Sequence, residues 1–268
     1  MPRVTLGEIS IELWEEGKGH PVLLLHGFPT TNFLWHNVVP RLVAAGCRSF
    51  APDLVGFGHS DAPDGVAIDM GSQAGWMLGL LDVLEIQRVL LVAHDVGTAV
   101  AQIMVARAPE RILGLMLIDG VYADRWGLEP LESIRSFDRT AADSLFRILV
   151  RRMHRQWTTE VSEHVIRRLL APYEGAVGGS RLIRAARSLD PQQTMAILDV
   201  LRRQPVPSRV VWGEKDQFLT VDEVARPLAD LLGARLKLYS GGHFLPLERP
   251  AEIASEVIAF LRDLPGTE

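Results

Sequence analysis

The chain has 268 residues, a formal net charge of −5, 47% hydrophobic residues and 23% charged residues. A chain of this length buries roughly three quarters of its extended surface on folding, so it can form a core without disulfides. The mildly acidic balance argues against general nucleic-acid binding, and the single cysteine, Cys47, excludes an intrachain disulfide and a multi-cysteine metal site. The sequence has neither an apolar signal core at its start nor an apolar run of about 18 residues, so we expect a cytoplasmic protein without a membrane span. Its oligomeric state is left open.

The first 120 residues alternate short apolar runs with helical segments. The runs at 4–6 and 9–13 predict a hairpin that turns near Gly7, and continuous apolar runs follow at 21–25, 48–51, 88–93 and 113–118. Continuous runs fit strands that are buried on both faces of a parallel sheet. Helical patterns occupy 35–45, 72–84 and 98–108, between these runs. The alternation predicts an α/β fold with a mostly parallel sheet and right-handed crossovers.

From about 122 to 190 the sequence becomes rich in arginine, and its apolar residues recur at helical spacing. Strand–helix alternation then resumes, with strands at 209–212 and 236–239 and helices at 221–232 and 250–261. We therefore predict a core formed by residues 1–121 and 191–268, and a small helical cap formed by residues 122–190. Such a cap would cover the carboxyl ends of the sheet, where parallel sheets bind ligands. The arginines are interpreted as solvated helix faces, with recognition of an anionic substrate as the alternative.

Candidate chemical groups follow the ends of predicted strands. The motif AHDVG at 93–97 has small residues two before and two after Asp95, which permits a sharp strand-to-helix turn that lifts the Asp95 side chain out of the sheet. His243, in SGGHF, follows the last predicted strand, and Asp216, in WGEKD, follows the strand before it. Asp119 ends the run at 113–118 and competes with Asp216 as the partner of the histidine.

These motifs, in this order, resemble the α/β-hydrolase superfamily, in which a nucleophile, an acid and a histidine follow successive strands. The HGFP loop at 26–29 resembles the loop that supplies one oxyanion N–H, here that of Phe28, while the residue after the nucleophile, Val96, supplies the other. His26 is expected to be a structural hydrogen-bonding residue behind this loop. An aspartate in place of the usual serine resembles the branch of epoxide hydrolases and haloalkane or fluoroacetate-type dehalogenases. The resemblance implies that Asp95 is the nucleophile of a catalytic triad.

An aspartate nucleophile suits a saturated carbon. Attack on an acyl carbon would give a reactive anhydride, whereas attack on a saturated carbon gives an ordinary alkyl ester. His243, oriented by Asp216, would then activate the water that hydrolyses this ester. No metal or organic cofactor is expected, and the expected partner is a small apolar molecule. A ligand-binding relative in which Asp95 has no catalytic role is a further alternative.

The leaving group separates the two leading activities. An epoxide leaves as an alkoxide that needs a proton, and the resemblance implies two tyrosines in the cap, of which Tyr173 is the better placed candidate and Tyr122 lies at the entrance. A halide is a stable anion, but dehalogenases of this family commonly have tryptophan and asparagine where this chain has Val96 and Phe28. We therefore predict an epoxide hydrolase that forms a vicinal diol first, and a haloalkane or haloacid dehalogenase second.

Other side chains are candidates for holding the substrate or the leaving group. His154 and Trp157 are three residues apart and would share one face of a cap helix, as in the histidine and tryptophan of fluoroacetate-type enzymes. For Trp157, packing of the cap on the core is the alternative. Trp35 and Phe28 add apolar surface near the HGFP loop, so the candidates for substrate contact are Tyr173, His154, Trp157 and Trp35.

Overall fold

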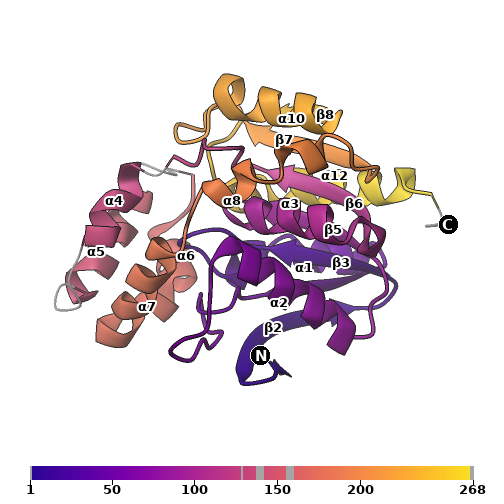
Figure 1. Ribbon diagram of the computed structural model, residues 1–268. Helices are drawn as coiled ribbons and strands as arrows, with labels where there is room; N and C mark the ends of the chain where they lie inside the picture. The colour runs from indigo at the N-terminus through magenta and orange to yellow at the C-terminus, as the bar shows by residue number, and fades with distance from the viewer. Residues whose placement is uncertain (1, 128, 137–141, 155–159, 266–268) are drawn as a thin grey trace.

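The computed structural model describes residues 2–127, 129–136, 142–154 and 160–265, and has an eight-stranded sheet at its centre (Figure 1). The order of the strands across the sheet is β1-β2-β4-β3-β5-β6-β7-β8. The strands are β1 (Arg3–Leu6), β2 (Ile9–Gly17), β3 (His20–Leu25), β4 (Cys47–Pro52), β5 (Val89–His94), β6 (Ile112–Ile118), β7 (Ser208–Gly213) and β8 (Arg235–Tyr239). This order and the helices on both faces confirm the predicted α/β-hydrolase architecture.

The pairing of the strands follows their sequence patterns. β1 and β2 form the predicted antiparallel hairpin, and β2 also pairs antiparallel with β4. The other neighbours, from β4 to β8, are parallel. Every residue of β5 is buried, as its continuous apolar run VLLVA at 89–93 predicts for a central strand that is covered on both faces.

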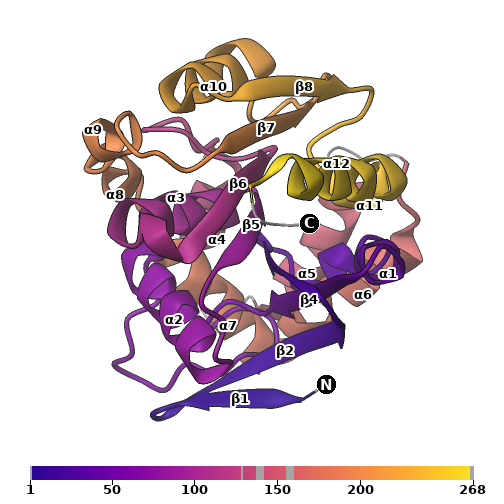
Figure 2. The same ribbon diagram turned by 90° about the vertical axis from the view of Figure 1, so that its right-hand side faces the viewer.

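Helices cover the sheet in two layers (Figure 2). One face carries α1 (Val39–Ala44) and α12 (Pro250–Asp263), and the other carries α2 (Met70–Val83), α3 (Gly97–Arg107) and α10 (Arg226–Leu232). Shorter elements complete the core: η1 (Asn32–Trp35), η2 (Pro109–Arg111), α8 (Gln192–Met195), α9 (Leu198–Leu201), η6 (Val221–Ala225) and α11 (Leu245–Glu248). In the part of the chain that the structure describes, no helix has the length and apolar character that a membrane crossing requires.

Two predicted helices are interrupted. The segment predicted at 35–45 forms the 3₁₀ turn η1 and then the separate helix α1, which has Pro40 in its first turn. The segment predicted at 221–232 begins with the π-helical turn η6 and continues as α10, again with a proline, Pro227, in the first turn. Proline lacks an N–H and fits the first turn of a helix, so it marks a new helix start inside both segments.

The helices of residues 129–187, between β6 and α8, gather beside one end of the sheet (Figure 1). They are α4 (Glu129–Ser136), α5 (Ala142–Arg152), α6 (Glu163–Leu170), the short turn η5 (Ala171–Tyr173) and α7 (Gly175–Arg187). Contacts with the core reach the loops that follow the carboxyl ends of strands: Thr31, after β3, donates through Oγ1 to the carbonyl of Leu169 at 3.3 Å. The helices therefore lie over the carboxyl edge of the sheet.

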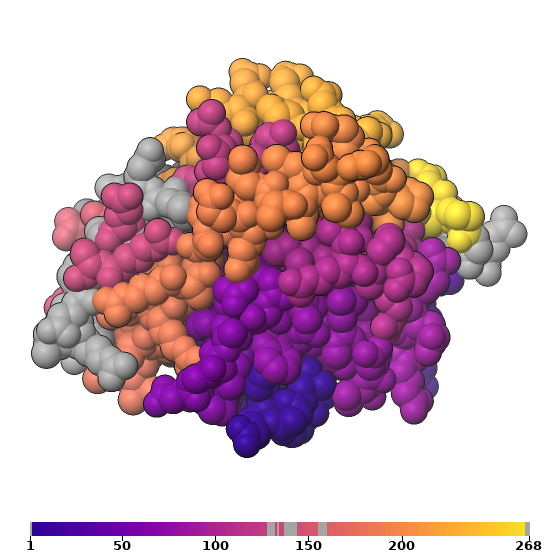
Figure 3. Space-filling model, in the orientation of Figure 1, coloured from indigo at the N-terminus to yellow at the C-terminus, as the bar shows by residue number. Residues whose placement is uncertain are grey.

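Arginines of α7 join this helix to the loop after β4. Arg184 donates to the carbonyl oxygens of Ala62 at 2.5 Å and Val66 at 2.8 Å, and Arg181 donates to the carbonyl of Gly58. In the space-filling view α7 lies directly against the core surface (Figure 3). The guanidinium groups of these two arginines are thus bonded to backbone carbonyls, which differs from the solvated faces expected from the sequence.

Candidate active site

A strained turn at the end of β5 presents Asp95. Asp95 has a φ of +51°, which is uncommon for a residue other than glycine, and stands directly before α3. The turn can form because two glycines leave room: a Cβ on Gly97 would lie 2.4 Å from the carbonyl oxygen of His26, and one on Gly27 would lie 2.3 Å from Asp95 Oδ1. The AHDVG and HGFP motifs therefore pack against each other with the aspartate between them.

His243 lies between two carboxylates. Its Nδ1–H donates to Asp216 Oδ2 at 2.8 Å, and its Nε2 is 3.3 Å from Asp95 Oδ2. Asp216 also accepts the backbone N–H groups of Phe218 at 2.9 Å and Leu219 at 3.0 Å, which fix the orientation of its carboxylate. The structure brings together Asp95, Asp216 and His243, three residues that lie far apart in the sequence.

Asp119 has different partners. Its carboxylate accepts the backbone N–H groups of Gly213 at 2.7 Å and Leu245 at 3.3 Å. The His243 ring donates its Nδ1–H to Asp216, so the geometry favours Asp216 over Asp119 as the acid that orients the histidine.

The charges of the three residues support one another. Burial alone would lower the pKa of His243, but the neighbouring Asp216 and Asp95 carboxylates raise it well above its ordinary value. Burial opposes the charge of Asp95, yet its hydrogen bond and charge interaction with His243 lower the pKa of this carboxyl below its ordinary value. The carboxylate form of Asp95 and the protonated form of His243 therefore stabilise each other.

Backbone N–H groups also bond the Asp95 carboxylate. Phe28 N–H donates to Oδ1 at 2.6 Å, and the N–H of Val96 also bonds the carboxylate. Oδ1 thus accepts the N–H of Phe28, while Oδ2 lies on the side of His243. Two converging N–H groups are the arrangement that stabilises a developing oxyanion.

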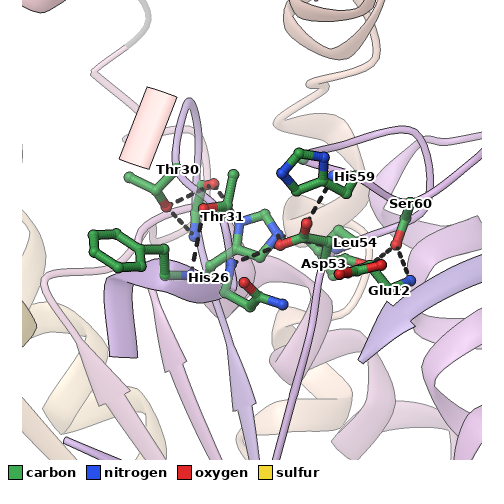
Figure 4. Close-up of polar contacts among 12 residues, drawn as sticks. Glu12, His26, Thr30, Thr31, Asp53, Leu54, His59 and Ser60 are labelled. Atoms are coloured by element: carbon green, nitrogen blue, oxygen red, sulfur yellow. Dashed lines mark hydrogen bonds and ion pairs between the residues drawn. The ribbon is translucent and has the colours of Figure 1, made fainter. Parts of the chain in front are cut away.

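His26 supports the loop that carries Phe28 (Figure 4). Its Nδ1–H donates to the carbonyl of Gly27 at 2.8 Å, and its Nε2 accepts the N–H of Leu54 at 2.9 Å. Burial lowers the pKa of His26 from 6.5 to about 4, so the ring is neutral and Nε2 stays free to accept. His26 contacts the backbone of both neighbouring loops, in agreement with the structural role expected from the sequence.

Asp53 is the second buried group of this network (Figure 4). Its carboxyl oxygens accept the N–H groups of Asn32 at 2.6 Å and His59 at 2.7 Å, and its own carbonyl accepts from Ser60 Oγ at 2.6 Å. Burial raises the pKa of Asp53 to about 7, although the two N–H donors oppose this rise. The group ties the loop after β4 to the turn that follows HGFP.

A small cavity of about 40 Å³ lies beside Asp95 and His243. Since a water molecule needs roughly 10–15 Å³ of such space, the cavity has room for about three waters. Its other lining residues are Phe28, Pro29, Val96, Trp126, Gly127, Phe218, Leu219 and Phe244. The indole N–H of Trp126 is already bonded, to the carbonyl of Ala123 and to Thr194 Oγ1, both at 3.0 Å. The described lining is therefore almost entirely apolar.

Tyr173 does not lie where a leaving-group donor is needed. Its side chain is fully buried, and its hydroxyl accepts the N–H of Gly58 at 3.1 Å and donates to the carbonyl of Thr30 at 3.3 Å. Tyr239, at the end of β8, donates its hydroxyl to Glu256 at 2.7 Å. Neither of them, nor Tyr122, is among the described residues that line the cavity, and these three are all the tyrosines of the chain.

The remaining predicted contacts are also placed elsewhere. Trp35 is fully buried in the core at the end of η1. His154 is half-buried, and its Nδ1 bonds the carbonyl of Val161 at 3.2 Å. Neither residue is part of the described cavity lining. Trp157 lies outside the described residues.

Most of the apolar wall of the cavity was not predicted from the sequence. Phe218 and Leu219 follow Asp216 by two and three residues, and Phe244 follows His243 directly. Trp126 lies in the segment after β6. Each belongs to a loop that leaves the carboxyl end of a strand, and this position is the signal that could have identified them. Within the ranges that the structure describes, no three His, Cys, Asp or Glu side chains are grouped so that they could hold a metal ion.

The Asp95 turn, the His243 loop and the Asp216 turn all lie within a stretch of the chain that matches a known family. Residues 20–250 match the model of the alpha/beta hydrolase fold family. The chain belongs to the α/β-hydrolase family. This α/β hydrolase therefore is an enzyme of the hydrolase class, as its sequence motifs predicted.

Relatives of this α/β hydrolase carry different reaction names. It is similar to a haloalkane dehalogenase of Mesorhizobium japonicum, with 41% identity over 109 residues that make up 40% of this chain and 35% of that protein. It is also similar to an epoxide hydrolase of Caballeronia sordidicola, with 25% identity and coverage of 95% and 91%. Among solved structures, a haloalkane dehalogenase of Agrobacterium tumefaciens shares the fold, with a TM-score of 0.82, 22% identity and coverage of 97% and 95%.

Proposed function

We propose that this α/β hydrolase displaces a leaving group from a saturated carbon through a covalent ester on Asp95. The observation that carries the proposal is that the two Asp95 oxygens have different partners. Oδ1 accepts the N–H of Phe28 at 2.6 Å, and Oδ2 faces His243 beside the cavity. A carboxylate held in this way has one oxygen available for attack. The other oxygen lies where N–H groups can stabilise negative charge later in the reaction.

In the first step, Asp95 Oδ2 attacks the carbon of the substrate. A C–O bond forms, the bond from carbon to the leaving group breaks, and the leaving group departs with the bonding electrons. The product is an alkyl ester on Asp95, and the negative charge of the carboxylate has moved to the leaving group. His243 does not gain or lose a proton in this step.

Ester formation prepares His243 for the second step. The charge of Asp95 helps to raise the pKa of His243, so neutralising Asp95 removes one of the two causes. His243 can then lose its proton to solvent and accept one from a water molecule at Nε2. That water attacks the ester carbonyl, and the oxyanion forms on Oδ1 beside the N–H groups of Phe28 and Val96. Cleavage of the acyl C–O bond then expels the alkoxide, which takes the proton from His243 Nε2–H and leaves as the alcohol. The Asp95 carboxylic acid returns its remaining proton to His243, which restores the starting carboxylate and imidazolium.

The cavity favours a halide as the leaving group. The three tyrosines of the chain lie elsewhere, and the Trp126 indole N–H is engaged, so the described lining offers no phenol or indole proton to an alkoxide. A halide needs no proton, and the positive edges of aromatic rings such as Phe28, Phe218 and Phe244 suit a polarisable anion. We therefore propose a small, apolar haloalkane as the substrate class, with a cap formed by residues 122–190 over the cavity.

Epoxide opening is the second candidate. It is favoured by the epoxide hydrolase of Caballeronia sordidicola, which aligns with 95% of this chain. Val96 and Phe28 also stand where dehalogenases of this family commonly have tryptophan and asparagine, and this favours the epoxide candidate. The two candidates share the Asp95 ester and differ in what the leaving oxygen or halogen requires.

The test is to incubate the His243→Gln variant with 1-bromobutane and, separately, with 1,2-epoxybutane, and to record the intact mass. Since the variant lacks the base for the second step, a stable butyl adduct at Asp95 is expected from 1-bromobutane, with release of one bromide. An adduct from the epoxide alone would transfer the proposal to the second candidate. Asp95→Asn should give no adduct, and Asp199→Asn, which changes an exposed carboxylate, serves as the matched control. Failure to form an adduct with either compound contradicts the proposal.

A further inference from the structure

Asp119 is a buried carboxyl group that the proposed reaction does not use. It stands directly after β6 with a φ of +42° and is fully buried. Its backbone N–H donates to the carbonyl of Val211 in β7 at 3.2 Å. The positive φ and the burial show that the chain accepts local strain to place this side chain between two neighbouring loops.

The two N–H groups that Asp119 accepts belong to the segments that carry the partners of Asp95. Gly213 ends β7 and lies three residues before Asp216, and its N–H is 2.7 Å from Asp119 Oδ1. Leu245 lies two residues after His243, and its N–H is 3.3 Å from Asp119 Oδ2. One carboxyl group thus links the end of β6 to the turn of Asp216 and to the loop of His243.

Other contacts hold the same loops from different sides. Lys215 N–H donates to the carbonyl of Gly241 at 2.9 Å, which joins the Asp216 turn to the His243 loop. His94, next to the nucleophile, donates through Nε2–H to the carbonyl of His243 at 2.7 Å. Asp119 adds a further link, because its single carboxyl group bonds both the Asp216 turn and the His243 loop.

We propose that Asp119 is a positioning residue, which holds the Asp216 turn and the His243 loop at the spacing that ester hydrolysis requires. The inference rests on the proposed function, since it assigns Asp119 to the second step of that reaction. Ester formation needs Asp95 and the cavity, whereas hydrolysis also needs His243 Nε2 at a defined distance from the ester. Displacement of the His243 loop should therefore slow the second step selectively.

The chemistry of a carboxyl group fits this role. Its two oxygens accept two N–H groups that approach from different segments, whereas an asparagine has one oxygen and would turn its NH₂ group toward an N–H. Burial and the neighbouring charge of Asp216 raise the pKa of Asp119 well above its ordinary value, so the two N–H groups that Asp119 accepts are what holds this carboxyl in place.

Rapid-quench measurements on Asp119→Ala with 1-bromobutane separate the two steps. We expect ester formation within about threefold of the wild type and ester hydrolysis about 10²-fold slower, which is the loss that a displacement of about 1 Å can cause. The butyl ester should then accumulate in steady state. The rate of ester hydrolysis in Asp119→Asn, which keeps one acceptor oxygen, should lie between those of the wild type and Asp119→Ala. If each step has the same rate in Asp119→Ala as in the wild type, the proposal is overturned.

Asp69→Ala is the control for a general loss of stability. Asp69 accepts the N–H of Ser72 at 3.1 Å as the N-cap of α2 and bonds Gln193 at 2.8 Å, so its loss also removes a hydrogen-bonded carboxylate. We expect it to lower stability without ester accumulation. If Asp69→Ala slows hydrolysis as much as Asp119→Ala does, the effect of Asp119 is structural only and the proposal fails.

A second readout does not depend on turnover. The proton between His243 Nδ1 and Asp216 gives a downfield resonance in ¹⁵N-histidine-labelled protein, and we expect it to shift or broaden in Asp119→Ala and Asp119→Asn but not in Asp69→Ala. If the wild type forms no ester with any substrate, the proposed function fails, and this resonance still decides the positioning role. An unchanged resonance in both Asp119 variants would reject that role.

Discussion

His26 offers a quantitative test of the network behind the Phe28 loop. Its Nε2 accepts the N–H of Leu54 at 2.9 Å, so a proton on Nε2 would break this bond and place a charge in the core. Burial accordingly lowers the pKa of His26 from 6.5 to about 4. Replacement by glutamine removes the titrating group while keeping a polar side chain of similar length.

The magnitude follows from the two pKa values. The folded state binds the proton less strongly than the unfolded state, so His26 contributes full stability above pH 6.5 and loses it as the pH falls toward about 4. A pKa difference of about 2.5 corresponds to a maximum of about 3 kcal/mol. Between about pH 7.5 and about pH 4.5, most of this contribution, about 2.5 kcal/mol, should disappear.

The assay is urea unfolding of the wild type and His26→Gln over this pH range. The wild type should lose about 2.5 kcal/mol more than the variant on acidification, because every other group titrates in both proteins. Asp53, whose Oδ1 is 3.9 Å from His26 Nε2, has a pKa of about 7 and is mostly neutral in the relevant interval. A stability difference that does not change with pH would refute the assignment of His26 as a buried neutral acceptor.

Three further substitutions test other parts of the structure. Tyr173→Phe should lower the unfolding free energy, measured in urea, by about 1–3 kcal/mol, because it leaves the buried N–H of Gly58 without its partner. Initial rates should show that kcat changes by less than about threefold, whereas a tenfold loss of kcat would restore Tyr173 as a leaving-group donor. Asp216→Asn should slow turnover by about 10³–10⁴-fold after one initial burst of halide, measured by stopped flow, whereas an unchanged steady rate would exclude Asp216 as the orienting acid. Phe218→Ala should raise kcat/KM for 1-bromohexane relative to bromoethane by enlarging the cavity; a constant ratio would show that Phe218 does not limit substrate size.

The sequence carried enough information for the sheet and for the turn at Asp95. Buried parallel strands need continuous apolar runs, so the runs at 88–93 and 113–118 identified β5 and β6 to within one residue. The spacing of small residues around Asp95 predicted a sharp turn, and the positive φ of Asp95 is its structural expression. These features are local, so local patterns are sufficient to find them.

The choice between Asp119 and Asp216 could not be made locally. Both follow neighbouring parallel strands, and both are buried near His243. What separates them is the direction of the carboxyl: the positive φ of Asp119 directs it to the N–H groups of Gly213 and Leu245, while Asp216 reaches the histidine. That direction depends on contacts between loops that are distant in the sequence.

The position of Tyr173 could not be predicted for a related reason. Its place in a helical insertion suggested a position over the cavity, but it ends the short turn η5, and its hydroxyl is held between Gly58 and Thr30. The hydroxyl therefore joins the insertion to the core. Helical periodicity does not reveal how a short turn docks, because that depends on which backbone groups of the core are left for it to bond.

The covalent ester on Asp95 is the central claim, and a single turnover in H₂¹⁸O tests it most directly. With enzyme in excess over 1-bromobutane, the oxygen of the released butanol should come from the Asp95 carboxylate and be ¹⁶O. The solvent ¹⁸O should appear in the peptide that contains Asp95. Butanol that carries ¹⁸O in the first turnover, with no label in that peptide, would show direct attack by water and contradict the account.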